Sequence, residues 1–136
     1  TADHVVMTYE FAHTVRIIYT DGSDHPLPND FWMGDSRGHW EGDTLVVDTT
    51  HFNGETWFDE AGNFHSDALH VVERYTPTSA YHIDYEVTIE DPEVFTRPWT
   101  MLMPLYRRVD EGLQLLDYDC VDFVLEEANR SDGGPR

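Results

Sequence analysis

The sequence predicts an all-β domain, and three observations lead to this prediction. Apolar and polar residues alternate with a period of two in several short segments, as they do in strands with one buried face. Turn signals rich in Gly, Pro, Asn and Asp separate these segments. A helical period is weak throughout, and its best candidate is a short stretch at 121–129. Together these features indicate an antiparallel meander of about eight strands.

The expected strands begin within the first residues of the chain. The clearest alternation places the apolar residues from Tyr81 to Ile89 on one face and polar residues on the other. Gly42 predicts a hairpin turn, since glycine readily adopts the positive φ that such turns need. Strands are expected at about 5–11, 15–20, 31–40, 44–51, 66–76, 81–90, 99–105 and 113–124, with a short one at 56–58.

A sheet of this size avoids exposed edges by closing into a barrel or by folding into a sandwich. We expect a calycin-like, lipocalin-like barrel, with a β-sandwich as the alternative. An eight-stranded barrel holds its own side chains or one small ligand. Residues 1–127 are expected to form a single β domain, and residues 128–136 a frayed tail.

The charge composition argues against several kinds of partner. Asp and Glu number 27 and basic residues 8, all of them arginine, so the net charge is −19. Such a charge repels phosphate backbones and anionic lipid, and no apolar run is long enough to span a bilayer. We therefore expect no nucleic acid and no membrane insertion. The lack of lysine excludes Schiff-base chemistry, and the single Cys120 excludes an internal disulfide.

Four of the eight histidines lie between Arg37 and Thr76. Imidazole and carboxylate groups suit zinc or copper, and the candidate ligands are His51, His65, Asp67 and His70. On one strand His65 and Asp67 share a face, whereas His70 faces the other way unless a bulge intervenes. Calcium is the alternative metal, because acidic residues gather in several turns, although none matches an EF-hand loop. These patterns fix no cofactor, and surface histidines are the competing interpretation.

Asp48, Glu73 and Tyr85 are the candidates for acid–base catalysis. Glu73 lies on a strand face that is otherwise apolar, and Asp48 sits similarly within its own strand. If both carboxyl groups point inward, burial is expected to raise their pKa values, as it does in general acids and bases. Alternatively, they form structural ion pairs with arginines such as Arg16.

Trp57 and Trp99 are candidate stacking surfaces for a sugar or an aromatic ligand, with Arg16 and Arg97 as candidate polar contacts. Trp99 is expected at the mouth of a barrel, because it begins a strand. Most aromatic residues of a small β domain fill the core instead. Ser66 lies between a histidine and an aspartate, but no nucleophile-elbow sequence surrounds it.

The chain contains the segments GHWEGDTLVVDTTHFN, TWFDEAGNFHSDALHVVERYTP and IDYEVTIEDPEVFTRPWTM. Together they resemble a large family of uncharacterised, usually exported bacterial proteins, from about Tyr9 to Cys120. The resemblance implies an extracellular or periplasmic location. It also implies a leader and a further N-terminal segment, which we expect to have been removed here. It brings no activity and no catalytic residues.

Three functions stay open on this basis. The first is a domain that binds a small apolar, aromatic or sugar-like ligand between its aromatic residues. The second is an enzyme, a small-molecule lyase, isomerase or hydrolase that uses histidine and carboxylate groups or a metal. The third is a self-associating extracellular domain, a homo-oligomer formed through edge strands or the additional N-terminal segment.

Overall fold

The computed structural model describes residues 3–26, 29–59 and 61–116. The chain divides into two compact units, of which unit 1 comprises Thr1–Met7 and Arg16–Leu113, and unit 2 comprises Thr8–Val15 and Gln114–Arg136. The predicted helical stretch, the predicted tail and most of the last expected strand lie outside the described residues.

Unit 2 contains a tight turn between the first two strands. The amide of Tyr9 donates to the carbonyl of Thr14 (2.9 Å), and the turn holds Ala12 and His13 at φ values of 52° and 50°. L residues adopt this left-handed region at a cost. The amide of Leu116 donates to the side chain of Glu10 (3.0 Å), so the two segments of this unit contact each other.

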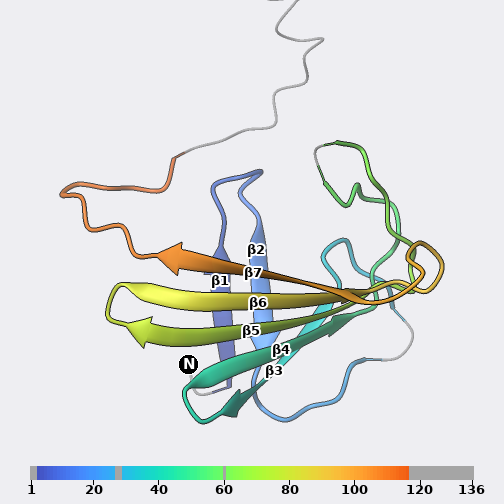
Figure 1. Ribbon diagram of the computed structural model, residues 1–136, viewed down its shortest axis with the longest axis horizontal. Helices are drawn as coiled ribbons and strands as arrows, with labels where there is room; N and C mark the ends of the chain where they lie inside the picture. The colour runs from blue at the N-terminus through green and yellow to red at the C-terminus, as the bar shows by residue number, and fades with distance from the viewer. Residues whose placement is uncertain (1–2, 27–28, 60, 117–136) are drawn as a thin grey trace, which may run out of the picture. The chain divides into compact units, whose positions relative to one another are not determined.

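Seven strands form one sheet, in which neighbours along the chain are neighbours in the sheet (Figure 1). They are β1 (His4–Thr8), β2 (Val15–Tyr19), β3 (Asp35–Glu41), β4 (Thr44–Thr50), β5 (His70–Ser79), β6 (His82–Glu90) and β7 (Trp99–Tyr106). No helix occurs among the residues that the structure describes, which confirms the all-β prediction. None of these residues therefore belongs to a helix that is long and apolar enough to cross a membrane.

The strands pair antiparallel from β3 to β7, but β2 and β3 run parallel, with Ile18 opposite Ser36. The prediction of a purely antiparallel meander is wrong at this pair. The reason is the long connection from Tyr19 to Asp35, which returns the chain to the end of the sheet where β2 begins. The sheet curls into a half-barrel, with β1 and β7 as the outer strands of its described part (Figure 1). Closure by an eighth strand stays a prediction.

The alternation along β4, β5 and β6 divides the sheet into an inner and an outer face. The register places Val47, Glu73 and Val87 side by side on the inner face. Two buried apolar clusters lie on this face, formed by Ile18, Leu45 and Val47 and by Leu69, Val87 and Ile89. Tyr75 of β5 packs against the first cluster together with Met7 of β1, so the curl brings the start of the chain over β5.

Gly34, just before β3, lies where no larger residue fits. Its φ is 67°, and an added Cβ would lie 2.7 Å from the carbonyl oxygen of Thr50. We expect Gly34→Ala to lower the free energy of unfolding by about 3 kcal/mol, since backbone strain and a steric clash add. Gly22→Ala is the matched control, because Gly22 has a φ of 78° and open space around it. Urea unfolding compares the two variants, and equal losses would contradict the close packing at Gly34.

Candidate functional site

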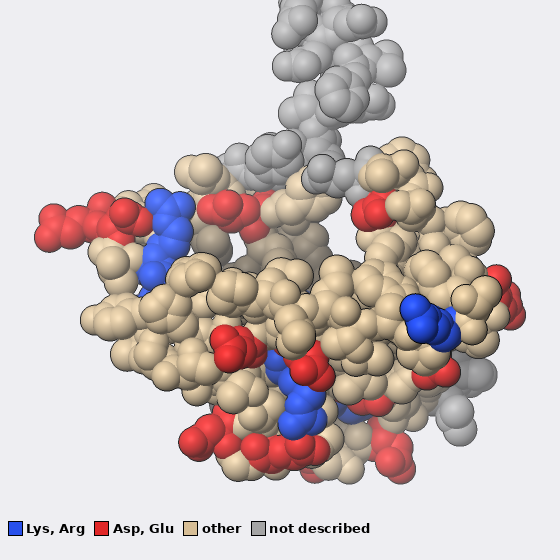
Figure 2. Space-filling view, viewed as in Figure 1, with Lys and Arg blue, Asp and Glu red and all other residues tan. Residues whose placement is uncertain are grey.

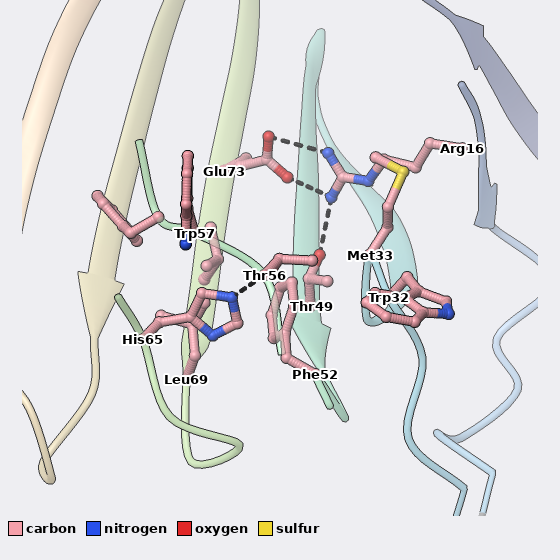
Figure 3. Close-up of a pocket in the computed structure, with 12 residues that line it drawn as sticks. Arg16, Trp32, Met33, Thr49, Phe52, Thr56, Trp57, His65, Leu69 and Glu73 are labelled. Carbon is pink, nitrogen blue, oxygen red and sulfur yellow. Dashed lines mark hydrogen bonds and ion pairs between the residues drawn. The ribbon is translucent and has the colours of Figure 1, made fainter. Parts of the chain in front are cut away.

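A pocket of about 270 Å³ opens on the inner face of the sheet, within unit 1 (Figure 3). Strands β2, β4 and β5 contribute to its lining, and so do the segment before β3 and the connection from β4 to β5. Its polar lining residues are Arg16, Thr49, Thr56, His65 and Glu73, and all its other lining residues are apolar or aromatic. Such a balance is typical of pockets for small molecules, in which a few polar groups orient the ligand.

Arg16 of β2 and Glu73 of β5 form a two-point ion pair at one end of this pocket (Figure 3). The guanidinium Nη1 donates to Oε1 (3.0 Å), and Nη2 donates to Oε2. Nη2 also donates to Oγ1 of Thr49 (2.8 Å), and Nε donates to Oγ of Ser36 (2.9 Å). Side chains from three other strands, β3, β4 and β5, thus hold this guanidinium group, which fixes its plane and its position.

Two tyrosines complete the environment of the carboxylate. The hydroxyls of Tyr75 and Tyr85 both donate to Oε1 of Glu73, at 2.8 and 2.9 Å. Burial acts to raise the pKa of Glu73, but the hydrogen bonds and charge of Arg16, with those of the tyrosines, outweigh it, so the pKa lies below its usual value. Burial and the neighbouring carboxylate raise the pKa of both tyrosines. Glu73 is therefore an ionised acceptor, and the expectation that burial raises its pKa is wrong.

Exposed aromatic side chains flank the pocket. Trp57 and Trp32 lie on opposite sides of it, with 75% and 62% of their surfaces exposed (Figure 3). Trp32 is held beside β4 because the amide of Phe31 donates to the carbonyl of His51 (2.8 Å). Trp57 is held by an isolated bridge to Phe64, so the short strand expected at 56–58 is only this single bridge. Two exposed indole groups thus flank the pocket.

Thr56 and His65 form the second polar feature of the pocket. Oγ1 of Thr56 lies 2.7 Å from Nε2 of His65, whose Nδ1 lies 2.9 Å from the backbone carbonyl oxygen of Ser66. His65 is buried, and the ring of Phe52 packs edge-on against it. The ring is therefore fixed at both nitrogens and at one face.

Buried Asp91 holds the loop that carries His65. Its Oδ2 accepts from the amide of Ser66 (2.7 Å), and its Oδ1 accepts from Oγ of Ser66 (2.7 Å) and from the amide of Glu93 (3.1 Å). Burial acts to raise the pKa of Asp91, but these hydrogen bonds lower it below the usual value. The hydroxyl of Ser66 is thus committed to Asp91 and does not face a histidine base.

No protein-family model, no curated protein and no solved structure matches this chain.

The four predicted metal ligands do not come together. His65 lies in the pocket, His51 stacks on His25 with ring centroids 5.6 Å apart, and Asp67 is exposed in the loop before β5. His70 contacts Asp48 on the outer face (2.8 Å). Within residues 3–26, 29–59 and 61–116, no three His, Cys, Asp or Glu side chains are placed to hold a metal ion.

Asp48 lies on the opposite face of the sheet from Glu73, so it cannot share a site with Glu73 and Tyr85. The register pairs Asp48 with Val72, whereas Val47 pairs with Glu73. The carboxylate of Asp48 accepts from Nε2 of His25 (3.1 Å) as well as from His70. It therefore links the loop before β3 to the outer face of the sheet.

The predicted ligand contacts are divided between two places. Arg16 and Trp57 line the pocket, whereas Arg97 lines a separate depression beyond the end of β6. Trp99 packs edge-on against Phe58 and Phe95 in the second core cluster, and its Nε1 is buried without a hydrogen-bond acceptor among the described residues. Trp99 is thus part of the core in this sheet.

Several pocket residues were not predicted from the sequence. Thr49 lies two residues after Val47 and four after Leu45, so the period of two in β4 predicts that all three side chains share the inner face. Thr56 and Met33 lie in irregular segments, where no periodicity predicts the direction of a side chain.

Proposed function

We propose that this domain binds a small, neutral, hydroxylated ligand with a ring, such as a sugar, in the inner-face pocket. The observation that carries the proposal is the Arg16–Glu73 ion pair at one end of an otherwise apolar pocket, with exposed Trp32 and Trp57 on its flanks. Indole faces suit the apolar faces of a sugar ring, and charged planar groups suit its hydroxyls.

Charge favours a neutral ligand over an anionic one. The two charged groups that line the pocket have opposite signs and lie in contact, so they leave little net charge there. Acidic side chains are spread over the face shown in Figure 2, and the chain carries a net charge of −19. An anionic ligand would be repelled at long range without a compensating positive site in the pocket.

Isothermal titration calorimetry with a panel of neutral mono- and disaccharides tests the proposal. We expect Trp57→Ala to weaken binding about 10-fold or more, because one stacking surface is lost. Trp40→Ala is the matched control, since Trp40 is also an exposed indole, with 58% of its surface accessible, but does not line the pocket. Equal affinities for the two variants, or no binding by any member of the panel, would contradict the proposal.

Export belongs to the same proposal, because the resemblance noted in the sequence is to exported proteins. An extracellular or periplasmic domain meets sugars and sugar derivatives at the cell surface. Barrel closure by an eighth strand is likewise proposed.

A further inference from the structure

The Thr56–His65 contact has a chemical consequence that simple binding does not require. A backbone carbonyl oxygen only accepts hydrogen bonds, so Nδ1 of His65, 2.9 Å from the carbonyl of Ser66, carries the ring hydrogen. In the neutral ring, Nε2 is then an acceptor, and the hydroxyl of Thr56 donates to it over 2.7 Å. Hydroxyl, imidazole and carbonyl thus form a chain of nucleophile, base and orienting group.

The pair lies inside the proposed binding pocket. Thr56 and His65 both line it, together with Arg16, and Figure 3 shows their contact within the same view as the ion pair. Burial of His65 and its contact with Phe52 hold the ring in one orientation. A ligand in the pocket would therefore meet a hydroxyl group that already donates to a base.

We propose that Thr56 and His65 form a nucleophile–base pair that hydrolyses small carboxylic esters, such as an acyl group carried on a hydroxylated ring. The proposal rests on the proposed function, because the pocket must admit such a ligand. Oγ1 of Thr56 attacks the acyl carbon and forms a C–O bond, while its hydrogen moves to Nε2 of His65. The bond to the leaving alcohol breaks, and the alkoxide takes that proton.

Water completes the cycle. It attacks the acyl-threonine ester and gives a proton to Nε2 of His65, which returns it to Oγ1 of Thr56 as the acid leaves. The net reaction is ester and water to acid and alcohol, with no oxidant or metal. Arg16 lines the same pocket, but its charge is already balanced by Glu73, so it gives only weak stabilisation to the negative charge that develops on the acyl oxygen. The orienting group is a carbonyl instead of a carboxylate, so we expect a slower reaction than that of a full triad.

Other hydroxyl–histidine pairs of the described chain do not fit this role. Ser66 donates to Asp91, as described above. Thr50 contacts its neighbour His51, and Ser79 contacts His82, but neither pair lines the pocket.

The test is hydrolysis of p-nitrophenyl acetate, with peptide mapping by mass spectrometry of protein quenched during turnover. We expect an acetyl group on Thr56, a rate lowered about 100-fold or more in Thr56→Val, and a rate within about 10-fold of wild type in Thr56→Ser. Thr88→Val is the matched control. Thr88 also has a hydroxyl contact, to Thr100 (3.0 Å), but lies outside the pocket and is expected to leave the rate unchanged.

Three results would overturn the proposal: no acetyl group on Thr56 of the wild-type protein, hydrolysis that persists in Thr56→Val, or an equal loss in Thr88→Val. Sugar titrations on the same samples separate the two hypotheses. If a sugar binds but the ester is not hydrolysed, the nucleophile–base pair is wrong and the binding function stands. If neither occurs, both are wrong. Because the acetyl group is sought on the wild-type protein, this test does not depend on whether Thr56→Val folds.

Discussion

Replacing Arg16 with methionine is expected to lower the free energy of unfolding by about 3–5 kcal/mol. The guanidinium group neutralises Glu73, of which only 5% is exposed, and also satisfies Thr49 and Ser36. Without it, the buried carboxylate keeps, among the residues that the structure describes, only the two tyrosine hydroxyls as partners. Urea unfolding at neutral pH, followed by tryptophan fluorescence, measures the loss.

The double variant Arg16→Met/Glu73→Leu is the decisive control. Removing both charges removes the unpaired carboxylate, so we expect the double variant to recover most of the stability that Arg16→Met loses. We expect the single and the double variant both to lose ligand binding, because both lack the ion pair at the polar end of the pocket. A double variant as unstable as the single one would contradict the buried ion pair as the source of the effect.

Asp91→Ala is expected to lower the free energy of unfolding by about 3 kcal/mol. Only 1% of Asp91 is exposed, and its removal leaves the part-buried amides of Ser66 and Glu93 without this acceptor. Because Ser66 follows His65, the same change should also disturb the pocket. Thermal unfolding measures the first effect, and the affinity for a bound sugar measures the second.

Asp59→Ala is a matched control for Asp91→Ala. Asp59 accepts the same kind of hydrogen bonds, from the amides of Ala61 (2.9 Å) and Asn63 (3.2 Å), but in an exposed turn where water replaces it. We expect a much smaller loss of stability for this variant. Similar losses for the two variants would contradict the role of burial.

The inner face was predictable where alternation is regular. Tyr85, Val87 and Ile89 share that face as predicted, and Glu73 follows from its apolar neighbours along β5. In β4 the pattern fails, because Val46 and Val47 are both buried, although they lie on opposite faces. When a strand is buried on both faces, its sequence does not alternate, so the sequence cannot predict which face lines the pocket.

Contacts between distant segments could not be predicted from local patterns. The parallel pairing of β2 with β3 depends on where a long connection returns, and the partnership of His25 with Asp48 depends on the same connection. The pairing of Thr56 with His65 is closer in sequence, but it forms within the irregular connection from β4 to β5, where no periodicity predicts it. Sequence patterns therefore predict the sheet better than they predict the loops that complete its pocket.

The indole N–H resonances of the four tryptophans test the binding pocket most directly. Trp32 and Trp57 line the pocket, whereas Trp40 and Trp99 do not. In a ¹H–¹⁵N NMR titration with a neutral sugar, assigned with single Trp→Phe variants, we expect the Trp32 and Trp57 signals to shift in a saturable way while the Trp40 signal stays in place. A titration that moves only the Trp40 signal, or none of the four, would contradict a ligand site between Trp32 and Trp57.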